Sequence, residues 1–144
     1  MVRSATSPAT RGEPAHKPKR SPDEVRAHWL EAFRRVRIET ETRASRLSPE
    51  DQIVQSMADA SPAKWHRAHV TWFFEQFLLV PCSSDYRIFD ERFPFLFNSY
   101  YVAAGPRHAR PQRGLITRPN GEDVAAYRAH VDAAVERLIA QVPA

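Results

Sequence analysis

Two histidines, His66 and His69, stand three residues apart in a stretch that has the period of a helix. Residues at this spacing share a helix face, so the two imidazoles could share a metal ion. The pair differs from the His-Glu-x-x-His pattern of zinc proteases in both its spacing and its lack of the glutamate. Trp65 and Phe73 lie one turn on either side of His69, which places His69 on the apolar side. Two interpretations are open: a metal ligand, or a core histidine whose ring bonds to a backbone carbonyl.

A loop at residues 105–114 carries Arg107, His108, Arg110 and Arg113 between glycines and prolines. Guanidinium groups bind carboxylates through paired hydrogen bonds, so the loop predicts a site for a small anionic ligand. A solvated basic loop that pairs with acids of neighbouring helices explains the same residues.

Helices must position these side chains, because 12 prolines and only 4 glycines are typical of helices joined by rigid loops. Start signals and apolar periodicity predict three long helices and one short turn. The helices are expected at residues 22–46, at 62–80 and from Asn120 to the end, and the turn at 48–51. Ser21 and Ser61 are the predicted N-caps of the first two helices, and Pro81 is expected to stop the second.

The helix predicted at 62–80 has two sides of different chemistry. One side gathers Lys64, Arg67, Thr71 and Glu75, and the other gathers Trp65, His69, Val70, Phe73, Gln76 and Phe77. We expect the apolar side to face the core. The core faces of all three helices are predicted to carry Trp29, Phe33, Trp65, Phe73, Phe77, Tyr127, Val131 and Leu138.

The segment at residues 81–119 has no long periodic stretch, yet it contains seven aromatic residues. We expect it to be packed and irregular, with a short helix around residues 95–102. An antiparallel bundle of three amphipathic helices usually needs a fourth to close its core. The predicted fold class is therefore all-α: a partial up-and-down bundle with one apolar seam uncovered, which predicts association or loose packing.

Composition and charge exclude several classes of protein. The 144 residues suit one domain, and no apolar run approaches the roughly 18 to 20 residues of a membrane helix. The single cysteine, Cys82, excludes an intrachain disulfide and favours a reducing cytoplasm. The net charge of +4 lies wholly in residues 1–20, which hold five basic residues and one acidic residue. We expect a disordered basic tail at 1–20 and a neutral folded domain at 21–144, which disfavours nucleic-acid binding.

Residues 59–75 resemble the opening of the DinB-like domain in ergothioneine-biosynthesis sulfoxide synthases, also called hercynine oxygenases. Residues 97–101, 105–108, 110–115 and 127–132 resemble later parts of the same proteins. The resemblance spans about 22–142 and implies a DinB-like four-helix bundle joined to a formylglycine-generating-enzyme-like domain.

The resemblance implies an iron(II) enzyme that uses O₂ to join the sulfur of cysteine or γ-glutamylcysteine to the imidazole ring of trimethylhistidine. It identifies His69 as the first of three histidine ligands. The other two belong to a His-x-x-x-His-x-Glu motif that this sequence lacks: four residues past His130 stands Ala134. We expect iron(II) in the complete family enzyme, and no bound iron and no activity in this chain alone.

Arg110 and Arg113 resemble the arginines that hold the carboxylates of the thiol substrate in this family. The implied partners are the thiol, trimethylhistidine, and a helix or C-terminal half that covers the seam; nucleic acid and membranes are not expected. The alternative is a non-catalytic DinB-like helical module that binds a partner through its uncovered apolar face.

Overall fold

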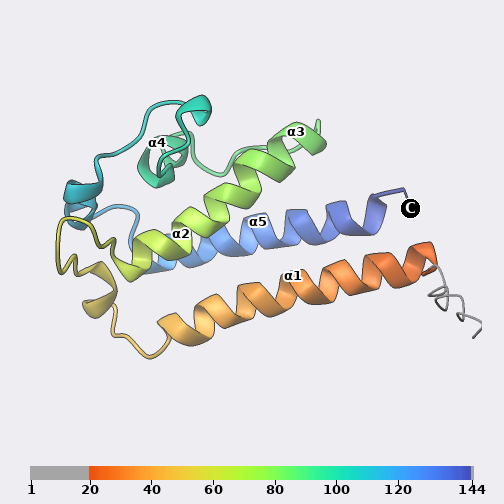
Figure 1. Cartoon of the computed structure of the whole chain (residues 1–144), viewed down its shortest axis with the longest axis horizontal. Helices are drawn as coiled ribbons and strands as arrows, with labels where there is room; N and C mark the ends of the chain where they lie inside the picture. Colours follow the sequence, from red (N-terminus) through yellow and green to blue (C-terminus); the bar gives the residue numbers. More distant parts are fainter. Residues whose placement is uncertain (1–19, 144) are drawn as a thin grey trace, which may run out of the picture.

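The computed structural model describes residues 20–143, and all its regular structure in that range is helical (Figure 1). The long helices are α1 (Pro22–Ala44), α2 (Ala63–Phe74) and α5 (Gly121–Gln141). Helix α2 runs through a π-helical turn (Glu75–Leu79) into α3 (Val80–Cys82). Shorter elements are α4 (Phe93–Phe97) and the 3₁₀ turns Asp51–Ile53, Val102–Ala104 and Arg110–Leu115. The predicted all-α class is confirmed, whereas the tail predicted at residues 1–20 lies, except for Arg20, outside the described residues.

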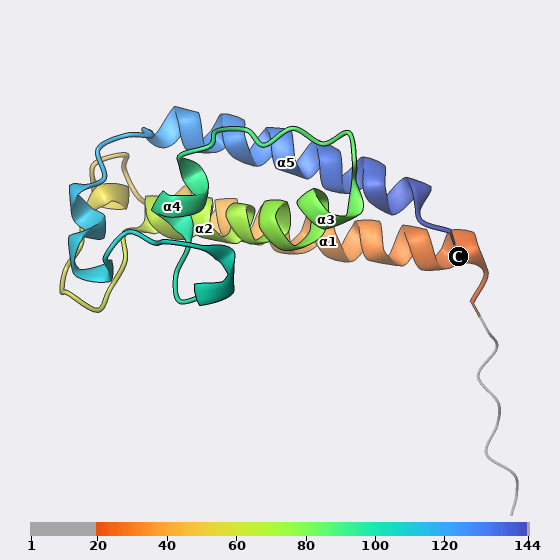
Figure 2. The same ribbon diagram turned by 90° about the horizontal axis from the view of Figure 1, so that it is seen from above.

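The ribbon runs back and forth along one long axis (Figure 1). Helix α1 runs antiparallel to α2, and the chain then returns so that α5 runs in the same direction as α2. The returning segment passes beside α5 before it reaches α4, which lies next to α2 (Figure 2). This return brings the aromatic segment against both helices.

Two of the predicted helix starts are confirmed, and the third differs. Ser21 caps α1 in a reciprocal capping box with Glu24, and Asn120 caps α5 in the same way with Asp123. The N-cap of α2 is Pro62, and no side chain caps this helix. The predicted cap, Ser61, instead accepts a hydrogen bond of 2.9 Å from the Arg113 guanidinium, because the loop that carries Arg113 packs against this helix start.

The predicted stop at Pro81 was wrong by two residues. The helix ends at Cys82, because the π-helical turn changes the hydrogen-bond register just before Pro81. Pro81 then lies at the start of α3, and because it has no N–H it donates no hydrogen bond to the preceding π-helical turn.

The aromatic segment is packed, as predicted, but its helix is shorter and begins earlier than the expected 95–102. Phe93 and Phe97 of α4 are buried, and the Phe93 ring lies 4.9 Å from that of Tyr127 on α5. Helix α4 ends at Asn98, whose amide accepts from the Tyr101 N–H and donates to the carbonyls of Tyr101 and Gly105. These local bonds compete with further helical turns.

The orientation of α2 contradicts the prediction. The polar stripe Lys64, Arg67, Thr71 and Glu75 is buried. Trp65 is buried as expected, but Phe73 and Phe77 are 41% and 42% exposed. On α1, Trp29 is 60% exposed, while Arg37 is only 5% exposed. The predicted core members Phe33, Trp65, Tyr127 and Val131 are confirmed, and Leu138 packs against the core while half-buried.

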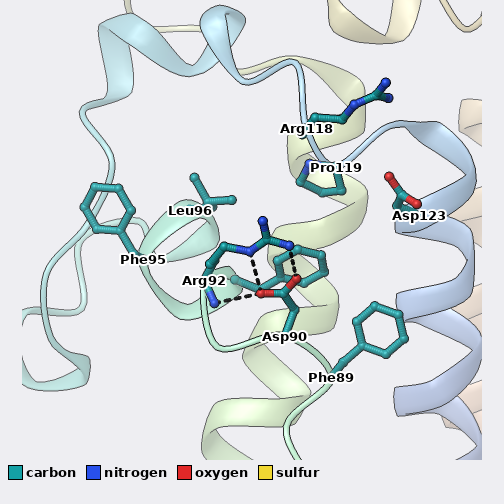
Figure 3. Close-up of a pocket in the computed structure, with 9 residues that line it drawn as sticks. Phe89, Asp90, Arg92, Phe95, Leu96, Arg118, Pro119 and Asp123 are labelled. Carbon is teal, nitrogen blue, oxygen red and sulfur yellow. Dashed lines mark hydrogen bonds and ion pairs between the residues drawn. The ribbon is translucent and has the colours of Figure 1, made fainter.

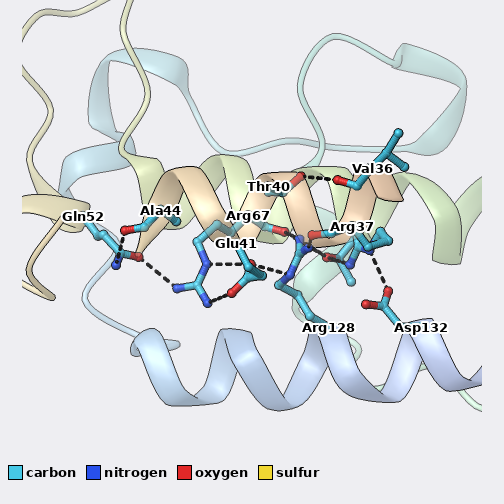
Figure 4. A network of polar contacts seen from close by, with 10 residues as sticks. Val36, Arg37, Thr40, Glu41, Ala44, Gln52, Arg67, Arg128 and Asp132 are labelled. Atoms are coloured by element: carbon cyan, nitrogen blue, oxygen red, sulfur yellow. Dashed lines mark hydrogen bonds and ion pairs between the residues drawn. The ribbon is translucent and has the colours of Figure 1, made fainter. Parts of the chain in front are cut away.

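A network of charged side chains explains this inversion (Figure 4). Glu41 of α1 accepts from Arg67 of α2 at 2.6 Å and from Arg128 of α5 at 2.6 Å. Arg128 also donates to the backbone carbonyls of Arg37 and Arg67. The polar side of α2 can therefore be buried with its hydrogen bonds made.

Arg37 links the same three helices. It donates to Asp132 of α5 at 2.7 Å and to the Thr71 hydroxyl of α2 at 2.7 Å. Burial lowers the pKa of Arg37, while the nearby Asp132 carboxylate raises it. One of its nitrogens, Nη1, is buried without a hydrogen-bond partner among the described residues.

Glu75 is the buried acid at the other end of the polar stripe. Its Oε2 accepts from the Tyr127 hydroxyl at 2.6 Å, and its Oε1 accepts from the Tyr86 hydroxyl at 2.7 Å and from the Phe89 N–H at 3.1 Å. Burial and the Glu75 charge together raise the pKa of Tyr127, so this hydroxyl stays protonated and donates. These bonds fasten the aromatic segment to α2 and α5.

An apolar groove remains open between α1, the end of α2 and α5. It has a volume of about 430 Å³ and is lined by apolar residues alone. The lining residues are Trp29, Ala32, Phe33, Val36, Phe74, Leu78, Val135 and Ile139. No helix in residues 20–143 combines the length and the apolar character needed to cross a membrane.

Candidate functional site

His69 projects from α2 into a stack of aromatic rings. Its imidazole lies 4.6 Å from the Trp65 ring at 14° and 5.6 Å from the Trp72 ring at 21°. Its Nδ1 lies 2.7 Å from the Phe97 carbonyl oxygen at the end of α4. A carbonyl only accepts, so Nδ1 carries the proton and Nε2 keeps a lone pair.

This arrangement is compatible with both interpretations of His69. Histidines that bind metals commonly hold the opposite ring nitrogen on a carbonyl, which fixes the tautomer and the ring orientation. A core histidine bonded to a carbonyl has the same contact. Burial lowers the pKa of His69; the Phe97 carbonyl raises it, and Arg113 lowers it further. The ring is therefore neutral at pH 7, and its Nε2 makes no hydrogen bond with the residues that the structure describes.

His66 is exposed on α2, with its ring 5.4 Å from that of Trp65 and at 83° to it. Although much of the residue is exposed, partial removal of the ring from water lowers its pKa, and the charges of Arg113 and Arg110 lower it further. Within residues 20–143, no group of three or more His, Cys, Asp or Glu side chains could hold a metal ion. An iron(II) site of the oxygenase type needs three protein ligands. His69 fits one ligand position, but the described residues do not form a complete iron site.

His130 and Ala134 of α5 do not extend the site. The His130 ring packs 5.5 Å from Tyr86 and 5.4 Å from Phe89, and its Nε2 lies 3.2 Å from the Arg87 carbonyl. Ala134 is buried in the helical core.

Arg113, in the loop at residues 105–114, packs against the stack formed by the rings of Trp65, His69 and Trp72. Its guanidinium carbon lies 3.6 Å from the centre of the Trp65 ring, and it donates to the Ser61 hydroxyl at 2.9 Å and to the Asn98 carbonyl at 3.4 Å. Burial, Arg110 and Arg107 lower the pKa of Arg113 to about 10. The cation is thus held by protein groups and by an aromatic face.

The two arginines of the predicted clamp have different surroundings. Arg113 is buried, whereas Arg110 begins the same 3₁₀ turn and is exposed. The Arg110 carbonyl accepts from the Gln55 amide at 2.8 Å, which ties the turn to the loop before α2. Only Arg110 presents its side chain to solvent, and the binding of a substrate carboxylate by the pair stays a prediction.

An exposed aromatic cluster, which we define as Phe73, Phe77, Tyr100 and Tyr101, continues the stack beyond Trp72. The Trp72 ring lies 5.7 Å from Tyr101, and Phe73 and Phe77 lie 5.8 and 5.2 Å from Tyr101. Tyr100 stacks on Tyr101 at 4.7 Å. The cluster forms an aromatic surface next to the His69 stack.

Three contacts of the site were not predicted from the sequence. The Phe97 carbonyl has no sequence signal, because every residue carries a carbonyl. Trp72 was not grouped with His69, although it stacks on it. The bond from Arg113 to Ser61 could not be foreseen, because the two residues are 52 positions apart.

Comparison with known proteins gives the family. No curated protein matches this chain. The family model of the DinB superfamily matches residues 32–144, a stretch that holds most of α1, all of α2, α4 and α5, and the His69 site. Because this match covers more than half of the sequence, the chain belongs to the DinB superfamily.

Proposed function

We propose that this chain is the DinB-like part of a cytoplasmic iron(II) oxygenase that joins a cysteine-type thiol to trimethylhistidine in ergothioneine biosynthesis. In this proposal His69 supplies one of three metal ligands, and the other two come from polypeptide outside the printed sequence. Iron, when bound, would activate O₂ for the formation of the carbon–sulfur bond. The chain alone is expected to be inactive.

The geometry of His69 carries the proposal. Its Nδ1 is held by the Phe97 carbonyl at 2.7 Å, and its ring is fixed between Trp65 and Trp72. A ligand histidine needs this fixed tautomer and a free Nε2. The motif around His69 resembles the sulfoxide synthases, and the chain belongs to the DinB superfamily.

Reading the coding DNA beyond Ala144 is the first test of the proposal. The proposal expects a segment that encodes His-x-x-x-His-x-Glu within about one helix length. In a polypeptide that includes that segment, His69→Ala should abolish stoichiometric iron(II) binding under anaerobic conditions. His66→Ala is the matched control and should leave the iron content unchanged.

Two results would contradict this function. One is the absence of such a motif from the encoded polypeptide and from any gene product that co-purifies with the chain. The other is equal iron content in the His69→Ala and His66→Ala variants. For the isolated 144-residue chain, anaerobic calorimetry should show no difference in iron(II) binding between the chain and its His69→Ala variant.

Arg110 allows a test of the thiol site. Arg110→Lys keeps the charge but loses the planar fork that binds a carboxylate in two places. In the complete enzyme we expect a raised KM for the thiol and little change for trimethylhistidine. Arg113→Lys is less informative, because Arg113 also bonds to Ser61 and stacks on Trp65.

A second candidate function is a non-catalytic helical module, favoured by the open groove and the exposed aromatic cluster. Under this function the chain should bind a hydrophobic dye and sediment heavier than 16.5 kDa. Co-expression with a segment that covers the groove should suppress both effects. A compact monomer that does not bind the dye would exclude the module function.

A further inference from the structure

A cavity of about 610 Å³ is lined by residues of α4, of the segment before it and of residues 118–123 (Figure 3). This volume falls within the range of roughly 300–1,000 Å³ that is typical of small-molecule sites. At the end of α4, the Leu96 and Phe97 carbonyls bond to Trp65 and His69 of α2. Phe93 and Leu96 of the same helix line the cavity. The cavity is therefore separate from the His69 site, although α4 contributes to both.

The walls of the cavity are mainly apolar. Phe89 and Phe95 are 38% and 43% exposed and lie on opposite sides of the cavity, while Phe93 is buried (Figure 3). Leu96 and Pro119 complete the apolar lining. Such walls accept an aromatic ring or a branched aliphatic group.

Four charged residues also line the cavity, and two of them neutralise each other. Arg92 donates through Nε and Nη2 to the Asp90 carboxylate, and its backbone N–H donates to the same group. The other two charged residues are Arg118 and Asp123, which precede and follow Pro119 in the sequence. They make no ion pair with each other or with any other described residue. Asp123 uses Oδ2 to accept from the Asn120 N–H. Beside an apolar surface, the lining thus presents one cation and one anion that form no salt bridge with the described residues, although the Asp123 charge also acts on the Lys64 ammonium.

We propose that this cavity binds a small zwitterion with an apolar body, of the α-amino-acid type. The ligand carboxylate binds the Arg118 guanidinium, its ammonium binds the Asp123 carboxylate, and its apolar body packs on Phe89, which lies on the same side of the cavity as Asp123 (Figure 3). A ligand with only one of these charges leaves the other residue without a partner. The proposal goes beyond the function proposed above, because it needs neither a metal nor His69.

Nuclear magnetic resonance of the ¹⁵N-labelled chain can test this with three probes of one shape. L-phenylalanine carries both charges, 3-phenylpropionate lacks the ammonium, and 2-phenylethylamine lacks the carboxylate. We expect millimolar phenylalanine to shift the amide signals of Phe89, Leu96 and Asp123. Each of the other two probes should bind about tenfold more weakly, as expected for the loss of one charge-assisted hydrogen bond.

Substitutions separate the two charges. Arg118→Gln should weaken the binding of phenylalanine and of phenylpropionate by about tenfold and leave the binding of phenylethylamine unchanged. Asp123→Asn keeps an oxygen for the helix cap. It should weaken the binding of phenylalanine and of phenylethylamine and leave the binding of phenylpropionate unchanged. Arg46→Gln and Glu122→Gln are matched controls, because both residues are exposed and lie outside the cavity lining.

Three outcomes would overturn the proposal. The first is the absence of signal changes at millimolar phenylalanine in a chain whose spectrum is folded. The second is a set of changes that maps to the apolar groove of α1 instead of to this cavity. The third is a loss of binding in the Arg118 or Asp123 variant that is the same for all three probes.

Discussion

Helix α2 contacts the rest of the chain through two sides of opposite chemistry. One side carries Arg67 and Thr71 and is buried in a charged network with α1 and α5. The other side carries Phe73 and Phe77, which are exposed. His69 lies at the boundary: it is half-buried, and its ring stacks between buried Trp65 and buried Trp72. The polar side therefore holds the three helices together, while part of the aromatic side stays exposed.

The comparison of the two sides shows that the burial of a side chain depends on whether its hydrogen bonds are made, as well as on its hydrophobicity. An arginine can be buried when carboxylates and carbonyls of neighbouring helices accept all but a few of its N–H groups. An exposed phenylalanine costs little as long as no larger core is available to it. Four variants, the last of them a double substitution, can break or sharpen this contrast, and they follow from the largest expected effect to the smallest.

Glu41→Ala should have the largest effect, because Glu41 is the shared acceptor for Arg67 and Arg128. Both arginines would stay buried without their carboxylate, and we expect a loss of about 3 kcal/mol in the free energy of unfolding, measured in urea. Glu39→Ala is the matched control, because Glu39 pairs with exposed Arg43 on the surface of the same helix. It should change stability by less than about 0.5 kcal/mol. Equal losses would show that the buried network does not hold the helices together.

Tyr127→Phe should have the next largest effect. It removes the hydroxyl that donates to Oε2 of buried Glu75, and this oxygen has no second donor among the described residues. We expect a loss of about 2 kcal/mol in the free energy of unfolding. Tyr86→Phe should cost less, because Oε1 of Glu75 keeps the Phe89 N–H. The reverse order of the two variants would contradict this account of the polar side.

His69→Gln tests the boundary through the pH dependence of stability. Burial lowers the pKa of His69 in the folded state. The unfolded chain therefore binds a proton first as pH falls below about 6.5, and the folded state loses stability until the pH reaches the lower folded pKa. Urea unfolding can be measured from about pH 8 to about pH 5, a range that spans this titration. The free energy of unfolding should fall more steeply with decreasing pH in the wild-type chain than in the variant. Parallel pH profiles would mean that the ring is no harder to protonate when folded.

Phe73→Gln combined with Phe77→Gln should have the smallest effect on stability, within about 0.5 kcal/mol, because both rings are exposed. The same double variant should bind less of a hydrophobic dye and associate less, as measured by fluorescence and sedimentation. A loss of several kcal/mol would place these rings in the core and remove the contrast between the two sides of α2.

Much of the local structure could be predicted from the sequence. Ser21 and Asn120 begin helices because their side chains bond to the backbone three residues later, an interaction within one turn. The three long helices and the packed aromatic segment follow from periodicity and composition in the same local way. His69 was singled out by its neighbours on the helix, and the structure places it on the Phe97 carbonyl.

Only the tertiary structure decided which side of α2 is buried. The charges on that side find their partners far along the chain: Arg67 bonds to Glu41 across 26 positions and to Arg128, through its carbonyl, across 61. The helical periodicity predicts that these charged residues face solvent, because it takes account of their charge but not of the partners that other helices supply. The sequence by itself determined where α1 and α5 begin and which residues the long helices carry. The packing of α1 and α5 determined which of those residues are buried, because a buried charge is stable only where another helix supplies its hydrogen bonds.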